Sequence, residues 1–215
     1  IISLYVGLIP TSSSFLRALP PLHSIPNILQ ITGKDEENIW NSKRFLLDLL
    51  QTVRMDFWCK EAKMEIDTVI LKLMALLQPE KIEDFLFGPD PVDADLKDCK
   101  TFLQENDKHH CVACCEMIAG RNAVAFKIWK QLEMEEITDS DYPGLKYFCE
   151  KLGKQTDDRL ILEYLPWILK RNENFGKKLL ESLAKSKTDP EIVFLVLKND
   201  PKAELYFLIT LIEER

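Results

Sequence analysis

Residues 107–132 read DKHHCVACCEMIAGRNAVAFKIWKQL, and this stretch decides how the rest of the chain is interpreted. Its first half carries small apolar residues on nearly every side: Cys111, Val112, Ala113, Cys114, Cys115, Ile118 and Ala119. A helix without a polar face is usually buried on several sides. Gly120 then suits the left-handed residue that follows a helix end. The first half therefore predicts a buried helix that ends near Gly120.

The second half of the stretch is an ordinary amphipathic helix with a period of about 3.6 residues. Val124, Ile128 and Leu132 form one apolar stripe, and Ala125 and Trp129 lie beside it. Two helices joined by so short a turn lie antiparallel, with the tryptophan covering the small residues of the first helix. Such a hairpin is the unit of an α-solenoid, so we predict an all-α fold of similar hairpins stacked on this one.

The same helical period recurs through residues 35–215, which we assign to the α-solenoid. It predicts about eleven helices and no strand. Two Asp-Pro pairs look like helix starts, an acidic cap before a proline in the first turn. Asp90 and Pro91 should open a helix that runs to about residue 105. Asp200 and Pro201 should open the last helix, whose core face is predicted to consist of Leu205, Leu208, Ile209 and Ile212.

Residues 1–34 show no sustained helical period. They are interrupted by four prolines and a polar run, yet they contain too many leucines for a free linker. We expect an irregular strap that lies along the helical body. The chain begins without methionine and stops within a helical pattern, so we expect it to be a piece of a longer protein.

Composition narrows the classes of function. The 215 residues are 46% hydrophobic and 29% charged, with a net charge of -7 and a pI near 5.1. An acidic chain of this kind is not expected to bind nucleic acid. No apolar run approaches the roughly 20 residues that a membrane span requires. All six cysteines fall in helical stretches, where they can serve as small buried residues, and this favours a reducing, cytoplasmic environment.

The sharpest candidate for chemistry is the run from His109 to Cys115. Cys111 and Cys114, or Cys111 and Cys115, share a helix face, and thiolates with imidazoles bind zinc. A structural zinc site normally takes four ligands from two separated pairs, and no second pair is present nearby. We therefore interpret these cysteines as packing residues and place the two histidines at an exposed helix start. We predict that the chain binds no metal and no cofactor.

No enzyme signature is present. A cysteine nucleophile needs a base that a third group orients across a cleft, and consecutive residues of one packed helix do not provide this. The motifs GxGxxG, GxxxxGK[ST] and HExxH are absent. We predict no catalytic residue and no enzymatic activity.

Two charged stretches are alternatives for partner contact. The acidic residues Glu133, Glu135, Glu136, Asp139 and Asp141 are interpreted as a solvated loop, or otherwise as a docking site for a basic partner. A basic group is interpreted as a solvated face, or otherwise as a contact to an anionic membrane surface. It consists of Lys170, Arg171, Lys177, Lys178, Lys185 and Lys187.

Several stretches resemble one family in the order in which they occur. They are SLYVGLIPTSSSFLRALPPLH (residues 3–23), KRFLLDLLQTVR (43–54), IDTVILKLMALL (66–77) and AVAFKIWKQL (123–132). They resemble the CORVET and HOPS vacuolar-sorting tethering subunits, and within that family its TGF-beta receptor-associated branch. Residues 66–170 resemble the first vacuolar-sorting domain of the family. The likeness is weaker from about Asn172 onward.

This resemblance implies a function that the periodicity does not. The chain would be a non-catalytic scaffold from the middle of the solenoid, cytoplasmic and peripheral on early endosomes through its complex. It would act in vesicle tethering and fusion and in protein transport. Implied partners are the class C core tethering subunits and, for the full-length protein, a Rab GTPase. The alternative is a signalling adaptor that binds TGF-beta receptors and Smad proteins. No partner-binding residue can be assigned from the resemblance.

Overall fold

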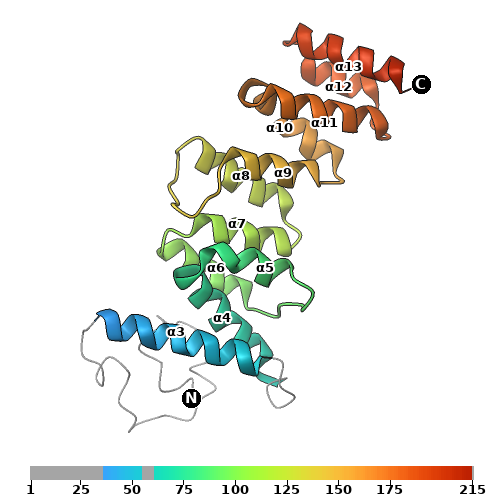
Figure 1. Cartoon of the computed structure of the whole chain (residues 1–215). Helices are drawn as coiled ribbons and strands as arrows, with labels where there is room; N and C mark the ends of the chain where they lie inside the picture. Colours follow the sequence, from blue (N-terminus) through green and yellow to red (C-terminus); the bar gives the residue numbers. More distant parts are fainter. Residues whose placement is uncertain (1–35, 55–60, 215) are drawn as a thin grey trace. The chain divides into compact units, whose positions relative to one another are not determined.

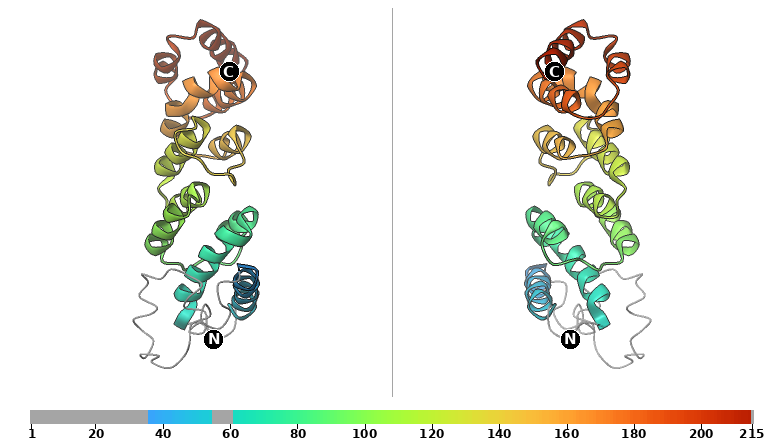
Figure 2. Two further views of the ribbon diagram at one scale, coloured as in Figure 1. Left: turned by 90° about the vertical axis from the view of Figure 1, so that its left-hand side faces the viewer. Right: turned by 90° about the vertical axis from the view of Figure 1, so that its right-hand side faces the viewer.

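The computed structural model describes residues 36–54 and 61–214 (Figure 1). The described residues form eleven α-helices and one short 3₁₀ helix, and they contain no strand. The two further views in Figure 2 likewise show only helices and loops over this part of the chain. The prediction of an all-α, solenoid-like fold with about eleven helices is confirmed. The predicted strap over residues 1–34 lies outside the described residues.

The chain divides into two compact units, 1–142 and 143–215. The described residues of the first unit form one 3₁₀ helix and six α-helices. They are α3 (Glu36–Val53), α4 (Lys63–Leu77), η3 (Pro79–Lys81), α5 (Ile82–Phe87), α6 (Leu96–Glu105), α7 (His109–Ile118) and α8 (Asn122–Glu133). Helix α4 packs on α3 and α6, and α7 packs on α5, α6 and α8. Each inner helix is thus covered by helices before and after it, as stacked hairpins require.

The second unit contains five helices. They are α9 (Leu145–Gly153), α10 (Asp158–Arg171), α11 (Glu173–Lys185), α12 (Pro190–Leu197) and α13 (Pro201–Glu213). Helix α10 packs on α9, α11 and α12, while α13 packs on α11 and α12. Gly176 lets α10 and α11 approach closely, since a Cβ atom there would lie 2.5 Å from Cδ2 of Leu169. The side chains of Asp157, Asn172, Asp189 and Asp200 cap the first turns of α10 to α13.

The hairpin of α7 and α8 forms where the sequence predicts it. Gly120 has φ +75°, the left-handed conformation expected after α7. Trp129 is fully buried, as its predicted covering role requires. The buried stripe of α8 is rotated from the predicted one, because Ala125, Phe126, Trp129 and Leu132 are buried whereas Val124 is exposed.

The predicted start of α6 is wrong. Helix α6 begins at Leu96, capped by Asp95, and not at Asp90. The carbonyls of Asp90 and Pro91 accept hydrogen bonds from Arg54, and this tertiary contact holds the segment outside a helix.

The core face of α13 is also not the predicted one. The four aliphatic residues expected to face inward are exposed: Leu205, Leu208, Ile209 and Ile212. The buried face instead consists of Ala203, Phe207 and Thr210. The neighbouring helices therefore cover the less apolar side of α13.

Candidate functional site

The cysteines of α7 are packing residues. Cys111, Cys114 and Cys115 are buried thiols, as is Cys99 of α6. Burial raises the pKa of the Cys99 thiol to about 12, and it also raises the pKa values of Cys111 and Cys115 well above their ordinary range. A thiol must lose its proton to act as a nucleophile or as a metal ligand. These raised values keep the three thiols protonated at neutral pH.

His110 is buried rather than exposed, which corrects the prediction made for the start of this helix. The indole Nε1 of Trp129 donates a hydrogen bond to Nδ1 of His110 at 3.1 Å. Tyr142 places its ring 5.8 Å from the imidazole, centroid to centroid. His109 is the more accessible histidine, with Nε2 3.8 Å from a carboxylate oxygen of Asp107. The two histidines therefore do not form one site.

Three potential metal ligands do lie together. Glu83 of α5, His110 and Cys114 place their ligand atoms within 4.8 Å of one another. Nε2 of His110 lies 3.8 Å from Oε1 of Glu83 and 4.0 Å from Sγ of Cys114. The position of Glu83 beside His110 could not be predicted from the sequence, because Glu83 belongs to a different short helix and no motif surrounds it.

The hydrogen bond from Trp129 argues against metal binding by this group. An indole N–H can only donate, so Nδ1 of His110 must accept and carries no proton. Neutral imidazole then carries its proton on Nε2, the nitrogen that faces Glu83 and Cys114. A metal ion at this point would have to displace that proton and break the bond to Trp129. The geometry instead fits a neutral histidine that joins α7 to α8.

The polar residues of the IDTVILKL stretch hold the segment between α5 and α6. Asp67 is fully buried, and its carboxylate accepts from Nε of Arg54 at 2.6 Å and from the backbone N–H of Asp93 at 2.8 Å. Thr68 accepts from the backbone N–H of Asp95, and Lys72 pairs with Asp98 at 2.8 Å. Buried charges are tolerated when they are paired and hydrogen-bonded. These residues therefore hold the backbone before α6 in place.

A second buried carboxylate links α6 to α7. Glu116 accepts from Lys100 at 2.7 Å and also pairs with Arg121 just beyond the end of α7. Burial alone would raise the pKa of Glu116, but the two hydrogen bonds outweigh it and lower this pKa below its usual value. Glu116 therefore remains ionised at neutral pH.

The acidic stretch after α8 is only partly solvated. The carboxylate of Asp139 accepts from the backbone N–H of His110 at 2.7 Å, in the first turn of α7. Asp141 pairs with Lys108 at 2.7 Å. These two residues fasten the loop to α7, whereas Glu135 and Glu136 are exposed. A docking role for a basic partner is thereby limited to the remaining carboxylates.

The basic group of the second unit is partly neutralised by its neighbours. Lys177 pairs with Glu173 at 2.7 Å, and Lys185 pairs with Glu214 at 3.1 Å. The guanidinium of Arg171 lies 6.0 Å from the ring centroid of Trp167. This distribution favours a solvated face over a concentrated membrane-binding patch.

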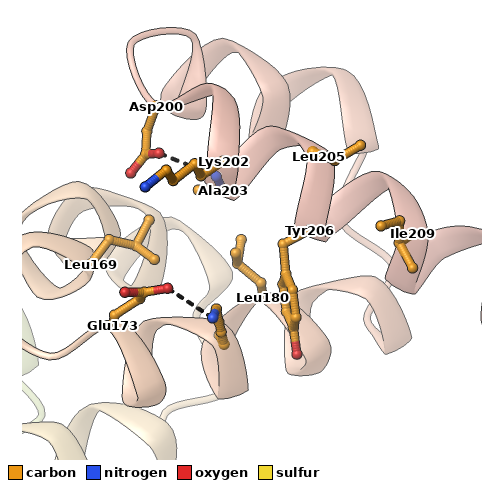
Figure 3. Close-up of a pocket in the computed structure, with 10 residues that line it drawn as sticks. Leu169, Glu173, Leu180, Asp200, Lys202, Ala203, Leu205, Tyr206 and Ile209 are labelled. Atoms are coloured by element: carbon orange, nitrogen blue, oxygen red, sulfur yellow. Dashed lines mark hydrogen bonds and ion pairs between the residues drawn. The ribbon is translucent and has the colours of Figure 1, made fainter.

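The second unit has a pocket of about 370 Å³ between α13 and the α10–α11 hairpin (Figure 3). In Figure 3, Ala203 and Tyr206 of α13 lie across from Leu169, Glu173 and Leu180. The hydroxyl of Tyr206 donates to Glu181 at 2.5 Å. The lining combines aliphatic side chains with two carboxylates and two lysines, and it contains no cysteine or histidine.

Comparison with curated proteins identifies relatives of this chain in several vertebrates. The chain is 30% identical over 221 aligned residues to human transforming growth factor-beta receptor-associated protein 1. It is 30% identical to the protein of that name in Bos taurus and 27% identical to the homologue in Danio rerio. All of these matches include the whole chain, so the family resemblance expected from the sequence is confirmed.

The chain spans only about a quarter of these relatives, 26% of the human protein and 25% of the bovine one. No family model matches the chain, and no solved structure matches it. None of the described helices combines the length and the apolar character that crossing a membrane requires.

Proposed function

We propose that this chain is a non-catalytic scaffold segment of an endosomal tethering subunit of the CORVET type. In this role it acts in vesicle tethering and fusion and in protein transport, in the cytoplasm and at the surface of early endosomes. Its partners are other proteins, above all the class C core tethering subunits, with a Rab GTPase engaged by the full-length protein. Any contact with the membrane is made through the complex.

The observation that supports this proposal is that the reactive side chains are buried and hydrogen-bonded or paired within the fold. The thiols of α7 are buried with raised pKa values, and His110 accepts from Trp129. The buried carboxylates of Asp67 and Glu116 are paired with cations. Side chains committed in this way supply packing and specificity but no acid, base or nucleophile. Stacked helical hairpins offer a long surface for protein partners.

A second candidate function is supported by the name of the relatives, which describes them as receptor-associated. In that role the chain is a signalling adaptor for TGF-beta receptors and Smad proteins. The two functions need not exclude each other in a longer protein. They make different claims about which partner this segment holds.

Retention on the purified, immobilised chain separates the two functions. Recombinant class C core subunits, TGF-beta receptor cytoplasmic regions and Smad proteins are passed over it in separate experiments. We expect the core subunits to be retained. Retention of receptor regions or Smads alone would favour the adaptor. Retention of none of them would remove this segment from both roles.

Metal content is measured alongside the binding experiment. We expect a purified sample analysed by inductively coupled plasma mass spectrometry to contain no stoichiometric zinc. One equivalent of zinc that disappears in Cys114→Ser would contradict the metal-free assignment.

A further inference from the structure

The segment that joins α5 to α6 carries two exposed aspartates (Figure 1). Residues 89–95 read PDPVDAD, and they form neither a helix nor a strand. Asp90 and Asp93 are exposed, whereas Asp95 is the cap of α6. Within residues 36–54 and 61–214, no side chain forms an ion pair or a hydrogen bond with the carboxylate of Asp90 or Asp93. These two residues contact the described fold through their backbone.

Two prolines hold the segment in an extended form. A residue that precedes proline is restricted to extended backbone, because the proline ring clashes with a helical neighbour. Gly88, before Pro89, has φ −67° and ψ 177°. The same restriction applies to Asp90 before Pro91. Endoproteases bind their substrates as extended strands, so this segment has the backbone form that such an enzyme accepts.

The spacing of the two aspartates matches the specificity of one protease class. Caspases are cysteine endoproteases with one carboxylate-binding pocket for the residue before the cut bond and another for the residue three positions upstream. They also favour a small residue directly after the bond. Asp93, Asp90 and Ala94 meet these three requirements in that order. The bond between Asp93 and Ala94 is therefore the one that such a cleft would cut.

One other pair of aspartates in the sequence has this spacing, Asp95 with Asp98. Asp98 lies in the first turn of α6 and pairs with Lys72 at 2.8 Å. The carboxylate of Asp95 accepts from the backbone N–H of Asp98, and Cys99 after it is fully buried. Paired side chains on a helix cannot enter an extended cleft, so this second pair is an internal control.

The folded chain restrains the first pair through the backbone. The N–H of Asp93 donates to Asp67 at 2.8 Å, and the carbonyl of Pro91 accepts from Lys63 at 2.7 Å. Arg54 also donates to that carbonyl, at 3.3 Å. A protease pairs with the peptide groups of the strand that it binds, so the segment must first release these contacts. The cleavage rate should then follow the population of the opened segment.

We propose that the bond between Asp93 and Ala94 is a cleavage site for a protease of the caspase class, restrained by Arg54, Lys63 and Asp67. The protease thiolate attacks the carbonyl carbon of Asp93, the C–N bond breaks, and the nitrogen of Ala94 leaves as a protonated amine. Water then hydrolyses the thioester, which leaves a carboxylate on Asp93 and restores the thiol. The cut yields fragments 1–93 and 94–215. This inference goes beyond the proposed function and does not depend on any partner.

The test incubates the whole purified chain with a purified executioner caspase and follows the products by intact mass spectrometry. We expect two fragments, the second beginning at Ala94 in N-terminal sequencing. Asp93→Glu and Asp90→Asn should each slow the cut by about tenfold or more, since one adds a methylene in its pocket and the other removes a charge. Asp48→Glu, at an exposed position of α3, should not change the rate. Circular dichroism before digestion verifies that each variant is folded.

A second variant tests the restraint. Lys63→Ala removes one hydrogen bond to the carbonyl of Pro91 and leaves both aspartates in place. The opened segment should become more populated, and the cut faster, by about two- to tenfold, the change that corresponds to one hydrogen bond. An unchanged rate in this variant would contradict the restraint. A synthetic peptide of residues 87–97, which has no such contacts, should be cut faster than the chain.

Three further results would overturn the inference. One is an uncut peptide, because the sequence itself would then not be recognised. Another is a peptide that is cut while the chain and Lys63→Ala both stay intact, because the site would then be closed in the folded protein. The third is a cut after Asp98 as fast as the cut after Asp93, which would show that the protease acts on unfolded chains.

Discussion

At the scale of single residues, the chain places its most reactive groups where they stabilise helix contacts. The bond from Trp129 to His110 is the clearest case, because both side chains are buried and lie on adjacent helices. A buried acceptor that loses its donor costs about 1–3 kcal/mol. This bond also determines which imidazole nitrogen carries the proton.

Trp129→Phe should therefore lower the free energy of unfolding by about 1–3 kcal/mol, since it leaves Nδ1 of His110 without its donor. Urea denaturation gives this value. In the unmodified protein, nitrogen-15 NMR of the imidazole should show the proton on Nε2. A proton on Nδ1 would contradict the hydrogen-bond assignment and would reopen the question of metal binding by Glu83, His110 and Cys114.

Glu116 gives the chain a defined acid sensitivity. Its pKa in the folded protein lies below the ordinary value of 4.5. The stabilisation is therefore complete above about pH 4.5 and is lost as the pH falls through the lower folded value. Glu116→Gln should flatten the loss of stability between about pH 5 and pH 3, measured by urea denaturation across that range. A loss as steep as that of the unmodified protein would show that other carboxylates dominate.

At the scale of helices, close packing rather than charge joins the α10–α11 hairpin. A Cβ atom on Gly176 would meet Leu169 at Cδ2, Cγ and Cα, at 2.5, 2.9 and 3.2 Å. The last of these atoms is backbone, so rotating the leucine side chain cannot relieve the whole overlap. The two helices would have to separate.

Gly176→Ala should destabilise the protein by about 1–3 kcal/mol, the usual cost of overpacking, despite the better helix propensity of alanine. Thermal unfolding of the single variants and of the double variant Leu169→Ala/Gly176→Ala measures the coupling. The glycine substitution should cost less when Leu169 is already alanine. Equal costs in both backgrounds would mean that the contact between these two residues does not limit the packing.

The helices could be predicted from the sequence, because the apolar period of a helix is a local pattern. The helices and side chains that pack against each of them could not be predicted in this way. The period correctly located α7, α8 and the turn at Gly120. It could not show that Arg54 donates hydrogen bonds to the carbonyl oxygens of Asp90 and Pro91, or that α6 begins only at Leu96. It located the aliphatic stripe of α13, but the prediction that this stripe faces the core is wrong, because its four residues are exposed.

The candidate site was less predictable than the fold for the same reason. The cysteine run was visible in the sequence, and its packing role follows from the absence of a second ligand pair. The burial of His110 depends on Trp129 and Tyr142, and its carboxylate neighbour Glu83 comes from α5. No spacing rule connects these positions.

At the scale of the whole chain, the two compact units each have a core of their own. The first is centred on buried residues such as Ile70, Leu103 and Phe126, and the second on residues such as Leu165 and Leu180. In proteins built of stacked repeats, stability is approximately the sum of local terms and nearest-neighbour contacts. A local defect should therefore be felt mainly within its own unit.

Native-state hydrogen exchange can test this expectation with one defect in each unit. Asp67→Asn leaves Arg54, whose side chain is 9% exposed, without its ionic partner. Breaking a buried pair in this way typically costs about 3–5 kcal/mol, so amides of α4 and α6 should exchange faster. Gly176→Ala should accelerate exchange in α10 and α11 and leave α4 and α6 unchanged. Glu150→Gln, in an exposed pair with Lys146, should change neither set, because such pairs contribute little. Uniform acceleration across residues 36–214 by either core variant would show that the two units unfold as one.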